Sequence, residues 1–160
     1  MAPGWSNFAV ITGSAAGALT GLLFVAVSLN RERIVRHRAL RGQAGQTLIL
    51  FMLPLLLSIL LVLPGPSATA LGPGLIVLAL VAAVALLLIG HGNKPSGDES
   101  ADPLTQLLDK ASPNMVVVVL TVVAGCLQLA GDDGLYWVAA ASVVSLVGGV
   151  ANAWLFLTRS

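Results

Sequence analysis

Few side chains of this 160-residue chain have the chemistry of a catalytic or metal-binding group. The two histidines, His37 and His91, stand at unrelated positions, and Cys126 is the single cysteine. A zinc site needs three or four clustered Cys, His or carboxylate ligands, and a single cysteine cannot form an intramolecular disulfide. We therefore expect neither a metal site nor a cofactor.

Ionisable side chains are also missing from the five long apolar runs of the sequence, which contain no Asp, Glu, Lys, Arg or His. Ionisable groups inside a membrane usually mark proton relays and ion pathways, so their absence argues against a proton-coupled transporter. A serine nucleophile needs an adjacent base. The serines of these runs have none within the membrane, and we expect no enzyme.

Small residues in the first apolar run form the most specific pattern of the chain. Gly13, Gly17 and Gly21 recur every four residues and are predicted to lie on one helix face. Small residues at this spacing let a second helix backbone come close in lipid, so we favour helix packing as their role. The alternative is a narrow polar path beside this face, lined by Thr20 and Ser28.

The last apolar run has a similar polar face, because Ser142, Ser145, Gly149 and Asn152 follow helical spacing. An unpaired amide is costly in an apolar environment. We therefore expect Asn152 to form a hydrogen bond to another helix, and we prefer this over a substrate site or a path lining.

Arginines cluster directly after the first apolar run, at Arg31, Arg33, Arg36, Arg38 and Arg41. Such a cluster is typical of a cytoplasmic loop that sets membrane topology. Its alternative role is contact with anionic lipid headgroups, worth about 1 kcal/mol per residue. No aromatic residues are interleaved with these arginines, so we expect no nucleic-acid partner.

The elements that position these residues are predicted by the apolar runs themselves. With 57% hydrophobic and 9% charged residues, the sequence indicates an all-α polytopic membrane protein, a single domain over residues 1–160. Five transmembrane helices are expected at about 8–29, 47–64, 71–89, 113–130 and 135–157, with cytoplasmic loops at 30–46 and 90–112.

Two of these helices have further expected features. Pro54 leaves the carbonyl of Leu50 without its usual donor, so we expect a kink in the second helix. The third helix, 71–89, is almost purely aliphatic and is expected to face lipid. In the loop that follows, Asp102 and Pro103 are suited to begin a short helix.

The positive charges predict the orientation in the membrane. With five spans, all eight Lys and Arg residues lie on one side, which the positive-inside rule makes cytoplasmic. The opposite side carries Asp132 and Asp133. The N-terminus is therefore expected outside and the C-terminus in the cytoplasm.

Two stretches, ALTGLLFVAVSLN at 18–30 and GLYWVAAASVVSLVGGVANAWLFL at 134–157, together resemble a family of small hypothetical membrane proteins of high-GC Gram-positive bacteria. Some members are labelled modulator of a membrane-bound AAA protease. The resemblance covers the first and last spans, and it implies a regulatory binding role in a bacterial plasma membrane without assigning a functional residue.

The expected function is that of a non-enzymatic multi-pass membrane protein that acts by helix–helix association. Its partners would be membrane lipid and either a second copy or another membrane protein, such as a larger complex or a protease. The alternative is a small homo-oligomeric channel or carrier with a neutral path lined by Gly, Ser, Thr and Asn.

Overall fold

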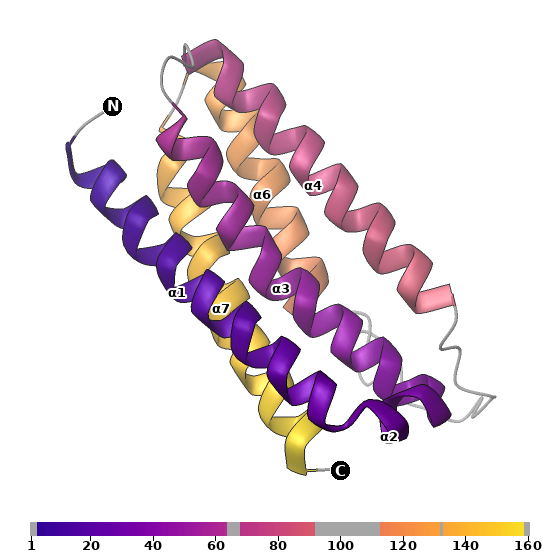
Figure 1. The fold of residues 1–160 in the computed structure, drawn as a ribbon. Helices are drawn as coiled ribbons and strands as arrows, with labels where there is room; N and C mark the ends of the chain where they lie inside the picture. The colour runs from indigo at the N-terminus through magenta and orange to yellow at the C-terminus, as the bar shows by residue number, and fades with distance from the viewer. Residues whose placement is uncertain (1–2, 64–67, 92–112, 132, 159–160) are drawn as a thin grey trace.

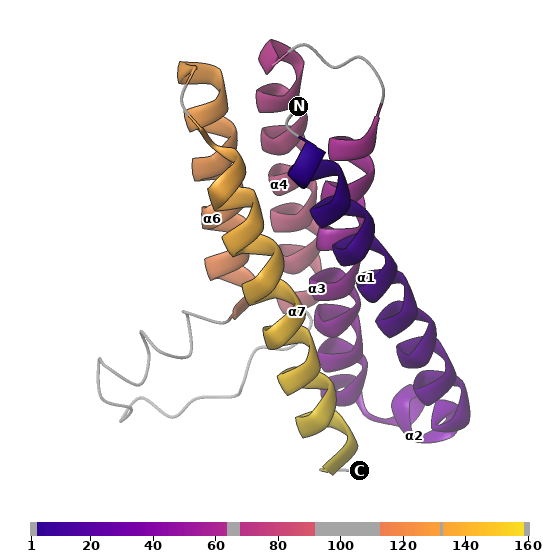
Figure 2. The same ribbon diagram turned by 90° about the vertical axis from the view of Figure 1, so that its left-hand side faces the viewer.

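The computed structural model describes residues 3–63, 68–91, 113–131 and 133–158, which form six helices and no strand (Figure 1). The helices are α1 (Pro3–Leu29), α2 (Arg31–Arg36), α3 (Arg38–Val62), α4 (Ala68–His91), α6 (Pro113–Ala130) and α7 (Leu135–Thr158). The five long helices run alternately up and down, so the two ends of the chain lie at opposite ends of the bundle (Figure 2).

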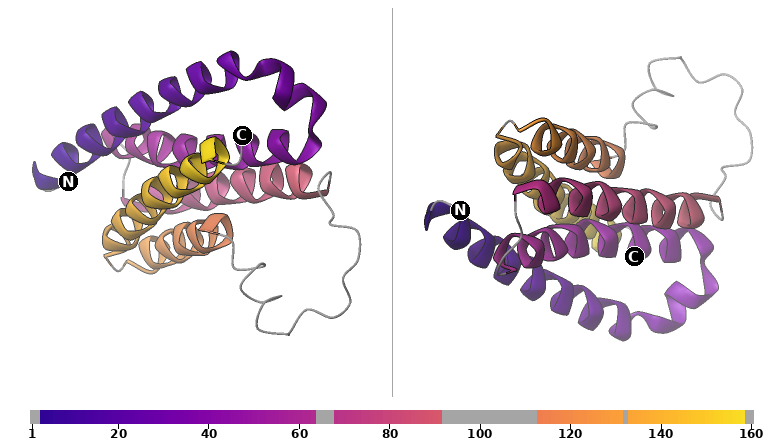
Figure 3. Two further views of the ribbon diagram at one scale, coloured as in Figure 1. Left: turned by 90° about the horizontal axis from the view of Figure 1, so that it is seen from below. Right: turned by 90° about the horizontal axis from the view of Figure 1, so that it is seen from above.

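Four of the helices close into a ring. α3 packs against α4 and α7, and α6 packs against the same two helices, so α3, α4, α6 and α7 form a four-helix bundle. α1 lies outside this ring, where it packs along α3 and contacts α7 only weakly (Figure 3). The first helix of the chain is therefore the most loosely attached long helix.

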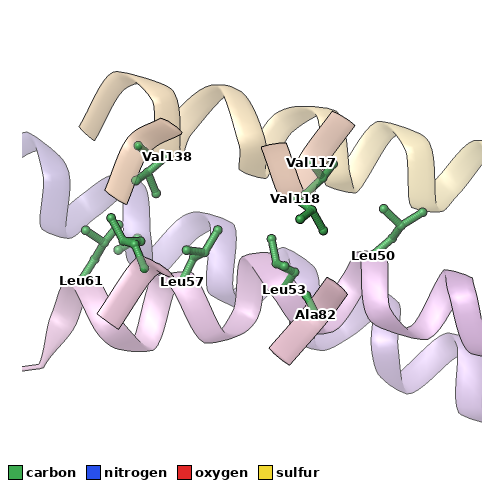
Figure 4. Packing of buried hydrophobic residues seen from close by; sticks show 11 residues of the cluster. Leu50, Leu53, Leu57, Leu61, Ala82, Val117, Val118 and Val138 are labelled. Atoms are coloured by element: carbon green, nitrogen blue, oxygen red, sulfur yellow. The ribbon is translucent and has the colours of Figure 1, made fainter. Parts of the chain in front are cut away.

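The core of the bundle is built around α3. Leu50, Leu53, Leu57 and Leu61 recur every three or four residues and line one face of α3 (Figure 4). They meet Val117, Val118, Val138 and Ala82 from the other three helices of the ring. Within the apolar spans, 44% of α3 is buried, compared with 22% of α1 and 22% of α4.

Four helices in the described part of the chain are long and apolar enough to cross a membrane, at Gly4–Leu29, Leu40–Val62, Leu71–Ile89 and Leu135–Leu155. The apolar helix Asn114–Ala130 is shorter. Large apolar side chains such as Ile11, Leu88 and Val147 project from the outside of the bundle. An apolar exterior around a packed bundle is the surface expected of a membrane protein.

The structure corrects the prediction of a loop at 30–46, because this segment is mostly helical. α2 covers Arg31–Arg36, and α3 begins at Arg38, nine residues before the predicted start at Thr47. Arginine, alanine, leucine and glutamine are good helix formers. The charges limit the apolar span, which starts at Leu40, but they do not end the helix.

The expectation that the third apolar helix faces lipid holds for one face of α4 only. Leu75 and Ala79 are buried against the bundle, whereas Leu80, Leu87 and Leu88 are exposed. A purely aliphatic sequence contains no polar residue to distinguish the two faces. The short helix expected from Asp102 lies outside the described residues.

The short connection between α6 and α7 depends on a glycine. Gly131 has a φ of 86°, which glycine adopts without strain, and its N–H donates to the carbonyl of Gln128. Gly134 is buried where the chain turns back, and a Cβ there would clash with the carbonyl oxygen of Ala124. These glycines let α7 start directly against α6.

Candidate functional site

The interface between α3 and α7 is where polar side chains meet inside the membrane-spanning part of the bundle. Pro54 lies within α3, which continues through it as one helix. Since proline has no N–H, the carbonyl of Leu50 lacks its intrahelical donor. The hydroxyl of Ser145 on α7 donates to this carbonyl over 2.6 Å. Ser145 is fully buried, so the bond replaces the missing one without water.

A second polar contact lies two turns further along α7. The amide Nδ2 of Asn152 donates to Thr47 Oγ1 over 2.7 Å, and this hydroxyl donates to the carbonyl of Gln43 over 2.9 Å. Thr47 is fully buried. The hydroxyl can accept from Asn152 and donate to Gln43 at once, so both of its hydrogen-bonding roles are used.

Gly149 lies between these two contacts and lets the helices approach. A Cβ at this position would lie 2.5 Å from Cε1 of Phe51, so the aromatic ring occupies the space of the missing side chain. Ser142 is buried as well, but its hydroxyl donates to the carbonyl of Val138 in its own helix over 2.9 Å. Of the four residues predicted on this face, three therefore contact α3.

The α3 side of this interface was not predicted from the sequence. Thr47 was expected at the start of the span rather than as a hydrogen-bond acceptor, and Phe51 was not singled out. The available signal was Pro54, because the residue four positions before a helical proline offers a free carbonyl. The sequence therefore identified the acceptor at Leu50 but not the helix that supplies the donor.

The three glycines predicted to form one face of α1 do not share one environment. A Cβ at Gly13 would lie 2.9 Å from Cβ of Ser58, and a Cβ at Gly17 would lie 3.4 Å from Cδ1 of Leu55, both on α3. A Cβ at Gly21 would meet nothing within 4 Å. Because four residues turn an α-helix by about 400°, each step rotates the pattern by about 40°. By Gly21 the pattern faces away from α3.

The hydroxyls predicted to line a path along α1 are bonded within their own helix. Thr20 donates to the carbonyl of Ala16, and Ser28 donates to the carbonyl of Val25, each over 2.8 Å. The polar face of α7 is turned to α3 instead of α1. The structure therefore does not bring the two predicted polar faces together.

The arginine cluster lies on α2 and the start of α3, at the same end of the bundle as the end of α7 (Figure 2). Arg31 and Arg36 are exposed, and Ile34 anchors α2 with a buried side chain. Arg41 Nη2 donates to the carbonyl of Val35 over 3.0 Å and so caps the end of α2. Arg33 lies within α2 and Arg38 begins α3.

Two further polar groups on α6 were not given a role from the sequence. The side-chain oxygens of Asn114 and Gln128 are buried and have no hydrogen-bond partner among the described residues. Both residues and Thr121 are spaced by seven positions, which places them on one face of α6. Within the described residues, no group of His, Cys, Asp and Glu could hold a metal ion. The polar side chains buried in the described part of the chain, such as those of Asn114 and Thr121, are neutral.

We compared the chain with known families, proteins and structures. No protein-family model, curated protein or solved structure matches the chain.

Proposed function

We propose that this chain is a non-enzymatic plasma-membrane protein with five spans, which acts by helix–helix association with a second copy or with a larger membrane complex. The observation that carries the proposal is the placement of α1. This helix packs against α3 with one face, and its opposite face is uncovered.

The uncovered face of α1 has the residues that helix association in lipid uses. Ser14, Ala18 and Gly21 are exposed, and their spacing of four and three places them on one face. Small residues let a partner helix come within van der Waals contact along its backbone, which helps drive association where the hydrophobic effect is absent. Gly13 and Gly17 already pack against α3, so Gly21 is the one of these three glycines left for a partner.

The five-span arrangement is supported by the geometry of the helices. α6 has 18 residues, which corresponds to a length of about 27 Å and lies within the range of membrane spans. The long helices alternate in direction, and α2 lies at the end where α7 finishes (Figure 2). The positive-inside rule then favours a cytoplasmic α2 and C-terminus and an external N-terminus.

The identity of the partner rests on the resemblance carried by residues 18–30 and 134–157, which supports a regulatory or accessory role toward a membrane protease. Part of α1 falls within the first of these stretches. A pull-down from native membranes, followed by mass analysis, distinguishes a stoichiometric partner from self-association.

The test is a substitution on the uncovered face of α1. Gly21→Ile places a branched side chain where the partner backbone would lie, and we expect a several-fold loss of the associated species. Ala15→Ile is the matched control, because Ala15 is also exposed and lies about 120° around the helix from Gly21. Native mass measurement or crosslinking in lipid nanodiscs gives the readout. Equal association for both variants would contradict the proposal.

The competing function is a small homo-oligomeric channel or carrier. Its expected lining is already engaged, because the hydroxyls of Thr20 and Ser145 and the amide of Asn152 all have intramolecular acceptors. A flux assay in liposomes tests this function directly. Specific solute flux that Gly21→Ile abolishes without loss of assembly would favour the channel.

A further inference from the structure

An apolar cleft lies between α1 and α7 near the arginine-rich end of the bundle. Its walls are formed by Leu23 and Ala26 of α1 and by Ala153 and Trp154 of α7, and Phe51 of α3 also lines it. The cleft volume is about 210 Å³. It exists because α1 follows α3 closely but contacts α7 only weakly.

The size of the cleft selects the kind of occupant. The cleft of about 210 Å³ is small compared with a helix, which with its side chains is about 10–12 Å across. Water is not favoured in this space, because the almost entirely apolar lining offers it few hydrogen-bond partners. A single hydrocarbon chain matches the apolar chemistry of the lining.

Positive charge follows the end of α1 that lines the cleft. Ala26 lines the cleft, and Arg31, the first residue of α2, follows five residues later in the chain. Arg31 and Arg36 are exposed, and α2 connects the end of α1 to the start of α3 (Figure 3). Glu32 is the single acidic residue of α2. Arginine donors suit the phosphate oxygens of a lipid headgroup.

We propose that this cleft is a binding site for one anionic phospholipid, with an acyl chain between α1 and α7 and the headgroup phosphate bound by Arg31 and Arg36. The larger groove of about 510 Å³, lined by Ser14 and Ser58 among others, lies at the opposite end of α1, away from the arginines of α2. It serves as the internal comparison. The proposal is independent of the association face of α1.

The experiment uses the three tryptophans, which lie at two ends of the molecule. The variant Trp5→Phe/Trp137→Phe leaves Trp154 in the cleft wall. The variant Trp5→Phe/Trp154→Phe leaves Trp137, which lies near the start of α7. Each is placed in phosphatidylcholine vesicles that contain either brominated phosphatidylglycerol or brominated phosphatidylcholine, and quenching is followed against the mole fraction of brominated lipid.

We expect brominated phosphatidylglycerol to quench Trp154 at a lower mole fraction than brominated phosphatidylcholine, by about five- to thirtyfold. Each surface arginine contributes a factor of about five toward an anionic lipid. Trp137 should show no such preference. Equal preference at both tryptophans would overturn the proposal, because it would indicate general lipid contact.

Two sets of variants separate the headgroup contact from the chain contact. Arg31→Gln/Arg36→Gln should abolish the preference at Trp154, whereas Lys94→Gln/Lys110→Gln, which removes the same charge, should leave it intact. Ala26→Phe should fill the cleft and reduce quenching of Trp154, whereas Ala15→Phe on the exposed face should not. An arginine variant that keeps the full preference would overturn the proposal.

Other occupants give different results. Displacement of brominated phosphatidylglycerol by millimolar inorganic phosphate would assign a free-phosphate site and overturn the proposal. If neither brominated lipid quenches Trp154 while crosslinks join two copies through α7, a second copy covers the cleft, and the lipid assignment is wrong.

Discussion

Ser145 and Asn152 stabilise the interface of α3 and α7 by hydrogen bonding to polar groups of α3. In lipid hydrocarbon these groups would have no hydrogen-bond partner. The apolar side chains of a membrane bundle gain little by moving from lipid to protein, so polar contacts and close packing decide which helices pair. Ser145 donates a hydrogen bond to the carbonyl that Pro54 leaves without a donor, and Asn152 donates one to a threonine hydroxyl. The pairing of the second long helix with the last is specified at these two positions.

Replacement of Asn152 by leucine tests the second contact. Asn152→Leu removes the donor to Thr47 Oγ1 and should lower the free energy of unfolding by about 0.6–2 kcal/mol. Reversible unfolding in mixed micelles measures this change. If the bond is present, Thr47→Val should be less damaging in the Asn152→Leu background than alone. Additive effects would show that the two side chains do not interact.

Replacement of Ser145 by alanine tests the first contact. Ser145→Ala leaves the buried carbonyl of Leu50 without a donor, which costs about 1–3 kcal/mol. Ser142→Ala is the matched control with a smaller loss, because that hydroxyl bonds within its own helix. In a Pro54→Ala background the restored N–H can serve Leu50, so Ser145→Ala should become nearly neutral. A full effect in that background would contradict this account.

At the scale of elements, the docking of α1 on α3 depends on how closely two backbones approach. Gly13→Ala should destabilise the protein by about 1–3 kcal/mol, because the new Cβ meets Cβ of Ser58 at 2.9 Å and neither atom can rotate away. Gly17→Ala should be neutral or stabilising, because its Cβ reaches only the flexible end of Leu55 and alanine favours the helix. Thermal unfolding of both variants in the same detergent compares them. Equal melting temperatures would contradict a close contact of α1 and α3 at Gly13.

The sequence predicted the positions of the helices better than it predicted which helices pack together. Long apolar runs and helical spacing identified the helices and the inward face of α7, since both depend on local pattern. The helical start of α3 was missed because charge was taken as the end of a helix. The split of Gly13 and Gly17 from Gly21 follows from helix rotation over two repeats, which a pattern of four conceals. Which helix each face meets depends on packing across the whole bundle, and the spacing of residues within one helix does not show it.

At the scale of the whole molecule, the protein has a closely packed part, the ring of α3, α4, α6 and α7, and an accessible part, the peripheral α1. α3 contributes more core residues than any other described helix, and it contacts α1, α4 and α7. α1 contacts mainly α3. A partner or a lipid therefore reaches α1 without opening the bundle, which is why both proposals concern this helix.

The orientation of the molecule is tested by labelling in intact cells. In a Cys126→Ala background, Asp133→Cys should react with an impermeant thiol reagent, because the connection between α6 and α7 is expected outside. Ser96→Cys should react only after permeabilisation. Cys126 must be removed because its side chain is exposed. The reverse pattern of labelling would invert the proposed topology.

The hydrogen bond to the carbonyl of Leu50 joins a helix that is synthesised early to one that is synthesised late. Its donor, Ser145, lies 95 residues later in the chain. At a synthesis rate of about 5–20 residues per second, α3 waits in the bilayer for roughly 5–20 s before α7 exists to complete it. During this interval the nascent helix exposes a bare acceptor to hydrocarbon. A ribosome that stalls within α6 therefore leaves an incomplete bundle, in which this carbonyl is open to any membrane-embedded factor that donates a hydrogen bond.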